Sequence, residues 1–457
     1  MRTPFLLACL TGSLAAQASW TQVVPATTPG PRTELQMDSD GTGALLFAGQ
    51  YGPSSVAYND LWRFDGVTWT NLQPAGTLPP ARSRFAAGYD PIRGKLVIFG
   101  GDKQYTGATG AYGDTWEWDA ATNTWAQMTP VNTPTARIHS RMAFSLINVG
   151  MLLYGGRGVG NAETWLWDGV DWTLQTPASQ PPGREQTHLA TDWSNGTVLM
   201  YGGSTGATTG VLGDTWIWTG GDWVQVVTAT TPGTGGIRNG KITYDSLRGR
   251  VVGMGGVAST GTFLNTTWEF DGIDWTERTI TPGPTGRTGE GLAYVNGLGT
   301  TVMHGGYAPA TGAVGDTWTY QTNAIATATS YGNGCAGSLG VPTLDASGRP
   351  WIGDTLSLNI GNASPLGIKF MLLGFSNTAW AGGILPAPMG AFGFPACTLL
   401  ASPDASNFVF GSAALSLPND AALIGFSLYA QAAVLEPQGA SFGLGMSAAL
   451  ALTIGAR

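Results

Sequence analysis

Six arginines recur along the first two thirds of the chain at intervals of roughly 50 residues, usually after a Pro- or Gly-rich turn. A guanidinium group can bind a carboxylate through two parallel hydrogen bonds. A ring of such groups would suit an acidic peptide, a uronate or a sialic-acid sugar. The alternative is structural, with each arginine donating to loop carbonyls or to an acidic residue of a neighbouring repeat. The six are Arg32, Arg82, Arg137, Arg184, Arg238 and Arg287.

Two histidines stand close to these arginines in the sequence. His139 follows Arg137 by two residues and His188 follows Arg184 by four, so both could point into the same space. We predict that they bind the ligand together with the six arginines. Neither these histidines nor His304 has the spacing of a local metal motif. We therefore expect no metal site, no cofactor and no assigned catalytic residue.

An acidic residue precedes most of the tryptophan-containing strands. It is Asp60, Asp114, Asp214 or Asp316, with Glu163 and Asn265 as substitutes. Side chains of this type often bond the backbone of a turn, and we expect that role here. A calcium site is not indicated, because the spaced aspartates of a calcium-binding loop are missing.

A repeated hairpin must position these side chains. Its fullest copy is GDTWEWDAATNTWAQM at Gly113–Met128, and a truncated copy, GDTWTYQT, ends at Thr322. An apolar run that ends in Gly-Gly, such as KLVIFGG at Lys95–Gly101, precedes most copies. Each repeat therefore predicts four antiparallel strands, and a period of about 50 residues with such strands is typical of a propeller blade. Further copies of the hairpin lie at Asn59–Leu72, Ala162–Gln175, Gly213–Val226 and Asn265–Thr279.

The last repeat lacks its final strand, and the start of the chain supplies one. WTQVVPATTPG from Trp20 closely repeats WVQVVTATTPG from Trp223. We therefore expect the N-terminal strand to complete the sixth blade. That closure would protect strand edges that are otherwise open to aggregation.

The arginine-led first strand, the Gly-Gly doublet, the aromatic third strand and the final tryptophan together resemble the kelch family. The resemblance covers about Ser19–Thr322 and implies an all-β fold, a six-bladed β-propeller of the kelch/galactose-oxidase type. Copper chemistry of the galactose-oxidase kind is not indicated, because the propeller contains no cysteine to crosslink with a tyrosine. The Ser-x-Asp-x-Gly-x-x-Trp box of sialidases is also missing.

The pattern changes after a short linker, residues 323–330. Spaced apolar runs between Gly, Pro, Asn and Asp turns predict a small β-sandwich over residues 331–457. The frame YGNGC at Tyr331–Cys335 resembles an uncharacterised C-terminal module of secreted bacterial proteins. Cys335 and Cys397 are expected to form a disulfide if the compartment is oxidising, and two free thiols are the alternative.

The first residues read as an export signal. Arg2, the apolar Phe5–Leu10 and the small-residue site Ala16–Ala18 predict a signal peptide over residues 1–18, and so a secreted or cell-surface protein. A lipoprotein anchored through Cys9 is the alternative. The net charge of −8 argues against nucleic acid as a partner.

The function that we predict is that of an exported, non-catalytic interaction protein. Its arginine-lined mouth would bind a protein or an acidic glycan. The first alternative is an epimerase or lyase on acidic sugars that uses the arginines with His139 or His188. The second is a purely structural surface protein.

Overall fold

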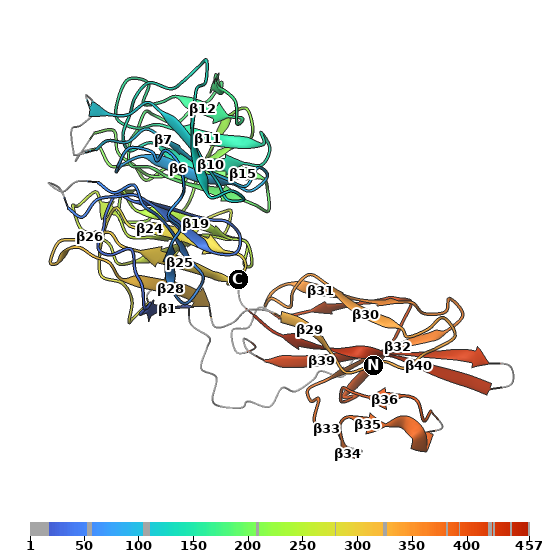
Figure 1. The fold of residues 1–457 in the computed structure, drawn as a ribbon. Coiled ribbons are helices and arrows are strands. Elements are labelled where there is room, and N and C mark those ends of the chain that lie inside the picture. The colour runs from blue at the N-terminus through green and yellow to red at the C-terminus, as the bar shows by residue number, and fades with distance from the viewer. Residues whose placement is uncertain are drawn as a thin grey trace. The chain divides into compact units, whose positions relative to one another are not determined.

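The computed structural model describes two compact units (Figure 1). The first is Ala18–Gln321, and the second begins at Thr322. The described residues are 18–52, 57–103, 110–206, 210–278, 280–322, 327–380, 383–392, 394–418, 423, 426–438 and 441–455. The predicted signal peptide up to residue 17, Cys9 and linker residues 323–326 lie outside them. No helix within these ranges has the length and apolar character needed to cross a membrane.

The first unit consists of six four-stranded antiparallel sheets, which confirms the predicted kelch-type propeller. Short Gly-rich turns and alternating apolar residues favour strands of three to six residues here. Five sheets follow chain order: β2–β5 (Gln36–Ser39, Ala44–Phe47, Leu61–Phe64, Trp69–Asn71), β6–β9 (Ala86–Asp90, Lys95–Phe99, Thr115–Asp119, Thr124–Met128), β10–β13 (Arg141–Ser145, Gly150–Tyr154, Thr164–Trp167, Trp172–Gln175), β14–β17 (His188–Asp192, Thr197–Tyr201, Thr215–Trp218, Trp223–Val226) and β19, β20, β22, β23 (Lys241–Asp245, Arg250–Met254, Thr267–Phe270, Trp275–Arg278).

The sixth sheet joins the two ends of this unit. Its order is β24 (Gly291–Val295), β25 (Thr300–His304), β28 (Thr317–Thr322) and β1 (Ala18–Val23). The N-terminal strand therefore completes the last sheet, as the repeated sequence at Trp20 predicts. Two short ribbons, β18–β21 (Ile237–Arg238, Val257–Ala258) and β26–β27 (Tyr307–Ala308, Gly312–Ala313), lie beside the sheets.

Tryptophans on the last strand of each sheet connect it to the preceding one. The Trp20 indole N–H donates to Thr267 Oγ1 at 2.7 Å, and four other sheets make the same bond. In the sheet β6–β9 the equivalent Trp125 nitrogen has no partner among the described atoms, because Leu61 stands where the other sheets have threonine. These tryptophans are almost fully buried, which at roughly 1.5–3 kcal/mol each makes them a main source of cohesion between sheets.

The first strands of the six sheets surround the axis, and a ring of backbone hydrogen bonds joins the residues just before them. Each N–H donates to the carbonyl of the equivalent residue in the preceding sheet, over 2.7–3.2 Å, and the sixth bond returns to the first residue. All six residues have a positive φ, between 55° and 65°. This ring, which we call the axial ring, consists of Glu34, Arg84, His139, Gln186, Asn239 and Gly289.

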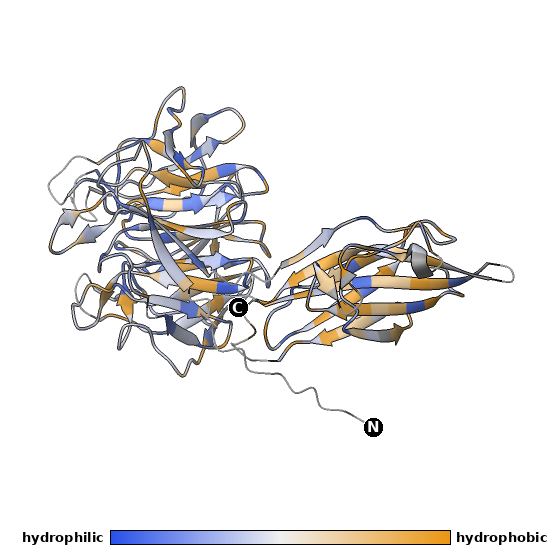
Figure 2. Cartoon of the chain, turned by 90° about the horizontal axis from the view of Figure 1, so that it is seen from below, coloured by the Kyte–Doolittle hydropathy of each residue, from blue (hydrophilic) through white to orange (hydrophobic). Residues whose placement is uncertain are grey.

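The second unit has two sheets that share one apolar core. The five-stranded sheet has the order β29 (Thr327–Tyr331), β40 (Ser441–Thr453), β39 (Ser427–Gln438), β32 (Ile368–Gly374), β37 (Ala405–Val409). The three-stranded sheet has the order β30 (Thr343–Ser347), β31 (Thr355–Gly361), β38 (Ser412–Ser416). Figure 2 shows the apolar residues along these strands. Smaller elements are β33 (Ala379–Trp380), β34 (Gly383–Ile384), β35 (Ala387–Pro388), η2 (Met389–Phe392) and β36 (Thr398–Leu399).

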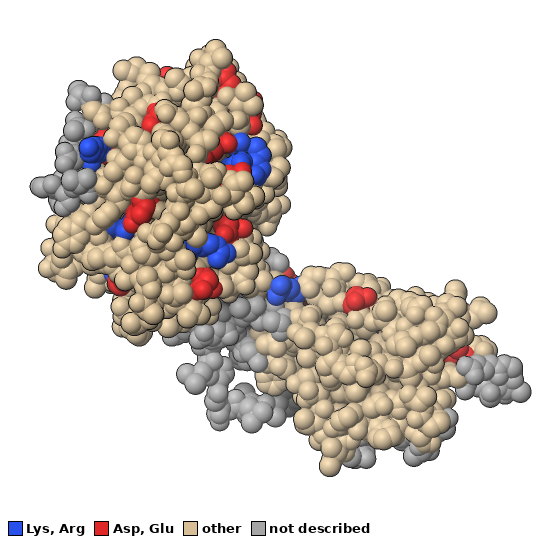
Figure 3. All heavy atoms as spheres, viewed as in Figure 1, with Lys and Arg blue, Asp and Glu red and all other residues tan. Residues whose placement is uncertain are grey.

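Cys335 and Cys397 form a disulfide in this unit, as the sequence predicts for an oxidising compartment. Both are buried with Leu385, Leu399 and Met446 in a second apolar cluster. On the face that Figure 3 shows, the second unit has few charged side chains.

Candidate functional site

Five of the six predicted arginines are at most 1% exposed. Each guanidinium group pairs with an acidic residue just before the third strand of its own sheet and donates to a carbonyl at the end of the second strand. Arg184, for example, bonds both carboxylate oxygens of Asp214 at 2.6 and 2.7 Å and the Gly202 carbonyl at 2.9 Å. The pairs are Arg32–Asp60, Arg82–Asp114, Arg137–Glu163, Arg184–Asp214 and Arg287–Asp316.

The same acids accept a hydrogen bond from the first tryptophan of the third strand. Trp216 Nε1 donates to Asp214 Oδ2 at 2.7 Å, and the other four sheets repeat this contact. Burial alone would raise the pKa of Asp114, Asp214 and Asp316, but the bonds from arginine and indole lower it on balance. We expected these acids to bond the backbone of a turn, and this expectation is corrected. Their carboxylates instead bond an arginine and a tryptophan and so hold both side chains in place. We call each such set an Arg–acid–Trp cluster.

The sheet formed by β19, β20, β22 and β23 lacks this cluster. Ile237 makes the backbone contact that arginine makes elsewhere, since its carbonyl accepts from Gly203 N–H. Thr266 replaces the acid, and it accepts the Trp268 indole N–H at 3.0 Å. The sixth predicted arginine, Arg238, is thus one residue out of register. It is partly exposed and donates to Gln186 Oε1 at 3.1 Å.

The structure fixes both predicted histidines within the chain. His188 Nε2 accepts the Gly240 N–H at 2.9 Å, so Nδ1 must donate to the Tyr201 carbonyl at 2.8 Å. Burial lowers the pKa of His188 to about 3, and the ring is neutral. His139 belongs to the axial ring, and its Nδ1 lies 3.0 Å from Glu185 Oε2. The predicted site residues therefore do not form one open surface.

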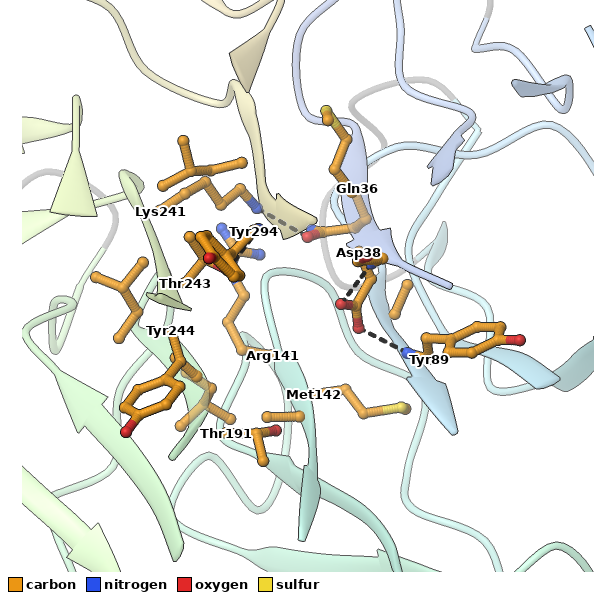
Figure 4. Close-up of a pocket in the computed structure, with 18 of the residues that line it drawn as sticks. Gln36, Asp38, Tyr89, Arg141, Met142, Thr191, Lys241, Thr243, Tyr244 and Tyr294 are labelled. Atoms are coloured by element: carbon orange, nitrogen blue, oxygen red, sulfur yellow. Dashed lines mark hydrogen bonds between the residues drawn. The ribbon is translucent and has the colours of Figure 1, made fainter. Parts of the chain in front are cut away.

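A central cavity of about 230 Å³ lies on the propeller axis instead. It extends from the first residues of the innermost strands to the turns that follow those strands, where Trp193 is 38% exposed. The Arg–acid–Trp clusters lie near the start of the innermost strands, away from these turns. Figure 4 shows polar and aromatic side chains around this cavity, including Gln36, Asp38, Arg141, Lys241 and Tyr294.

Two cations lie at the inner end of the cavity, and amide oxygens hold both. Arg141 Nη2 donates to Asn239 Oδ1 at 3.0 Å, and Lys241 Nζ donates to Gln36 Oε1 at 2.8 Å. Neither forms an ion pair with a residue that the structure describes. Arg141 is 5% exposed, and its Nε has no hydrogen-bond partner within the described part of the chain. Burial, with Arg141 nearby, lowers the pKa of Lys241 well below its ordinary value, and Glu290 and Glu34 oppose this shift.

Two buried acidic groups lie near these cations. Glu34 accepts from Asn239 Nδ2 at 2.8 Å; burial works to raise its pKa, but His139 and Arg141 lower it on balance. Glu290 is fully buried, burial raises its pKa to about 8, and neither of its carboxyl oxygens has a hydrogen-bond partner among the described residues. Among the described residues no cluster of three or more histidine, cysteine or acidic side chains could hold a metal ion.

Asp38 lies on the other side of the cavity. Its carboxylate accepts the backbone N–H groups of Tyr89 at 2.7 Å and Ser39 at 2.8 Å. Burial raises the pKa of Asp38 to about 6 in spite of these bonds. The cavity therefore presents two cations on one side and a titratable carboxyl group on the other.

Sequence reasoning missed Arg141, Lys241 and Asp38. A signal was present, because the first residue of the innermost strand differs in every repeat. Two copies have a small residue there, Ala86 and Gly291, whereas the others carry the polar side chains Gln36, Arg141, His188 and Lys241. All four polar residues line the cavity.

Comparison with known proteins found a family model, a curated protein and a solved structure that are similar to parts of this chain. Residues 33–218 match the family model described as KLHDC2/KLHL20/DRC7 Kelch-repeats domain. The Dynein regulatory complex subunit 7 of Chlamydomonas reinhardtii is 31% identical over 132 residues, which are 28% of this chain and 11% of that protein. A solved structure titled "Structure of YjhT" has a TM-score of 0.49 at 14% identity, covering 65% of this chain and 99% of that one. The family match and the repeated four-stranded sheets identify a kelch-repeat domain in this chain.

Proposed function

We propose that this chain is an exported, non-catalytic interaction protein whose propeller binds a partner protein at the central cavity. The observation that carries the proposal is the cavity itself, an opening on the axis that ends in two cations that form no ion pair with a described residue. A concave site with a few placed polar groups is the usual form of a binding site. Protein interaction is the role that the kelch-repeat match suggests.

Two features support export. The first residues have the composition of a signal peptide, and Cys335 and Cys397 form a disulfide. Disulfides persist in oxidising compartments and are rare in the cytosol. Secretion or display at the cell surface is therefore the localisation that we propose.

An acidic glycan is the second candidate ligand, since a uronate would bring the same negative charge to the cavity. The enzymatic alternative that uses His139 or His188 has less support, because an acid–base catalyst must be able to exchange protons with the substrate. Both nitrogens of His188 are engaged by the backbone, and His139 is buried against Glu185.

The test begins with the mature chain on peptide and glycan arrays, followed by affinity measurements on the hits. Trp193 lines the cavity, and its ring stacks on Phe144 with 5.9 Å between centroids. We expect Trp193→Ser to weaken binding of a peptide hit by ten-fold or more, the size of loss typical of a central aromatic contact. Val227→Ser is the control, since Val227 is 91% exposed and lies outside the cavity. Equal affinity of both variants would contradict binding at the cavity.

A further inference from the structure

The cations of the central cavity differ from the other buried cations of the propeller in their partners. Arg32, Arg82, Arg137, Arg184 and Arg287 each face a carboxylate, and Arg248 lies between Asp245 and Glu269. Arg141 and Lys241 face the amide oxygens of Asn239 and Gln36. An amide oxygen orients a cation but does not neutralise it, so a buried cation without a carboxylate is costly.

The remaining donors of these two cations are available to a ligand. The Lys241 ammonium group has three N–H donors, of which Gln36 accepts one. Arg141 Nη1 makes a bond of 3.3 Å to the Ser140 carbonyl, and its buried Nε makes none with a described residue. Figure 4 shows the nitrogen atoms of the two side chains close together beside Gln36. Two converging cations with spare donors match the two oxygens of one carboxylate.

The acidic neighbours do not substitute for that carboxylate. Glu34 already accepts from Asn239 and lies outside ion-pair distance of Arg141. Asp38 is occupied by the backbone N–H groups of Tyr89 and Ser39. Glu290 lies against Gly255 and forms neither an ion pair nor a hydrogen bond with Arg141 or Lys241 in the described part of the chain.

We infer that the inner end of the cavity is a carboxylate-binding site formed by Arg141 and Lys241, and that it receives an aspartate or glutamate side chain of the partner protein. This inference rests on the proposed function and specifies the group that the cavity recognises. The acidic residue would enter the cavity past Met142, Thr243 and Tyr294, which line its wall, with its carboxylate leading toward the cations.

The first test uses the unaltered mature protein and two probes, acetyl-Gly-Glu-Gly-amide and its glutamine counterpart. Titration calorimetry is expected to show binding at least ten-fold tighter for the glutamate peptide, with a difference that shrinks at high salt. Equal binding, or no binding of the glutamate peptide, would overturn the inference. Binding of methyl glucuronide without binding of the glutamate peptide would also overturn it, in favour of an acidic sugar.

The second test uses Arg141→Met and Lys241→Met, with Lys95→Met as the matched control. Lys95 Nζ lies 2.6 Å from Asp119 Oδ2, and neither residue lines the cavity. The cavity variants are expected to lose at least ten-fold in affinity for the glutamate peptide, and the control less than two-fold. If Trp193→Ser abolishes binding of the partner while both cavity variants retain it, the proposed function stands and the carboxylate site is wrong. If none of the three affects binding of the partner, the proposed function also fails.

Discussion

The propeller holds its cations in two contrasting settings. In the Arg–acid–Trp clusters, five arginines are paired with acids in their own sheets, and every pair also fixes a tryptophan. At the inner end of the cavity, the buried Arg141 and the partly buried Lys241 lie beside neutral amides. The first arrangement stabilises the fold and leaves no charged N–H donor for a ligand. The second is less stabilising and keeps N–H donors of Arg141 and Lys241 available, which is the usual condition of a functional site.

The largest effect is expected from breaking an Arg–acid–Trp cluster. Arg184→Met would leave the carboxylate of Asp214 without its guanidinium partner, which costs about 3–5 kcal/mol for a buried pair. Urea unfolding measures the loss. Lys95→Met, which breaks a partly exposed pair, is expected to cost no more than about 1 kcal/mol. Similar losses for the two variants would remove the structural role that we assign to the clusters.

The paired acids should also make the fold sensitive to low pH. Glu269 bonds Arg278 at 2.8 Å and Tyr320 at 2.7 Å, and it pairs with Arg248. Burial tends to raise the pKa of Glu269, but these cations lower it to about 2.

Because the pKa is lower in the folded state, the stabilisation by Glu269 is complete above pH 4.5 and disappears as the pH falls toward 2. Glu269→Gln should therefore cost about 3 kcal/mol at pH 6, from a shift of two to three pKa units, and much less near pH 2.5. Denaturant unfolding at a series of pH values tests this. A cost that stays constant across the range would contradict the prediction.

The cavity acid should respond in the opposite direction. Burial raises the pKa of Asp38 to about 6, so the folded state binds its proton more tightly than the unfolded state does. The contribution of Asp38 to stability then falls as the pH rises from about 4 to 6. The stability of Asp38→Asn relative to the wild type is expected to be about 1 kcal/mol more favourable at pH 7 than at pH 3.5, with solvent in the cavity moderating the effect. The loss of one of the two acceptor oxygens adds a cost that does not depend on pH. The same unfolding series measures the relative stability, and a value that is more favourable at acid pH would refute the assignment.

The smallest change in stability is expected at the cation that we assign to the ligand. Arg141→Met removes a buried charge that forms no ion pair with a described residue, so the free energy of unfolding should stay within about 1 kcal/mol of the wild type or rise. Thermal and urea unfolding, compared with Arg184→Met, provide the measurement. A loss above about 2 kcal/mol would place Arg141 with the structural arginines and weaken the contrast between the two settings.

The fold could be predicted because each sheet packs against its neighbouring sheets in the same way. The tryptophan hairpins and Gly-Gly doublets recur for this reason. The similarity of the Trp20 and Trp223 segments predicted the N-terminal strand that the structure places beside β28. The Cys335–Cys397 bond also agrees with the prediction for an oxidising compartment.

The site was harder to predict, and the same repetition explains why. A residue that recurs in every copy, such as the arginine, serves a need that every sheet has, and here that need is the Arg–acid–Trp cluster. A cavity on the axis occurs once, so its residues stand where the copies differ, as Arg141 and Lys241 do from Ala86 and Gly291. The sequence alone also does not show how far such a side chain is buried or which groups it faces.

The axial ring has a consequence for how such a molecule can change over time. Its six links use only main-chain atoms, and its members are six different amino acids: Glu34, Arg84, His139, Gln186, Asn239 and Gly289. The left-handed backbone conformation at each of them orients the N–H and C=O groups and does not require a particular side chain, although only the glycine adopts this conformation without strain. The main-chain ring can therefore keep its geometry while the side chains of its members are substituted. New binding specificities can arise at the axis in this way without a change in the fold.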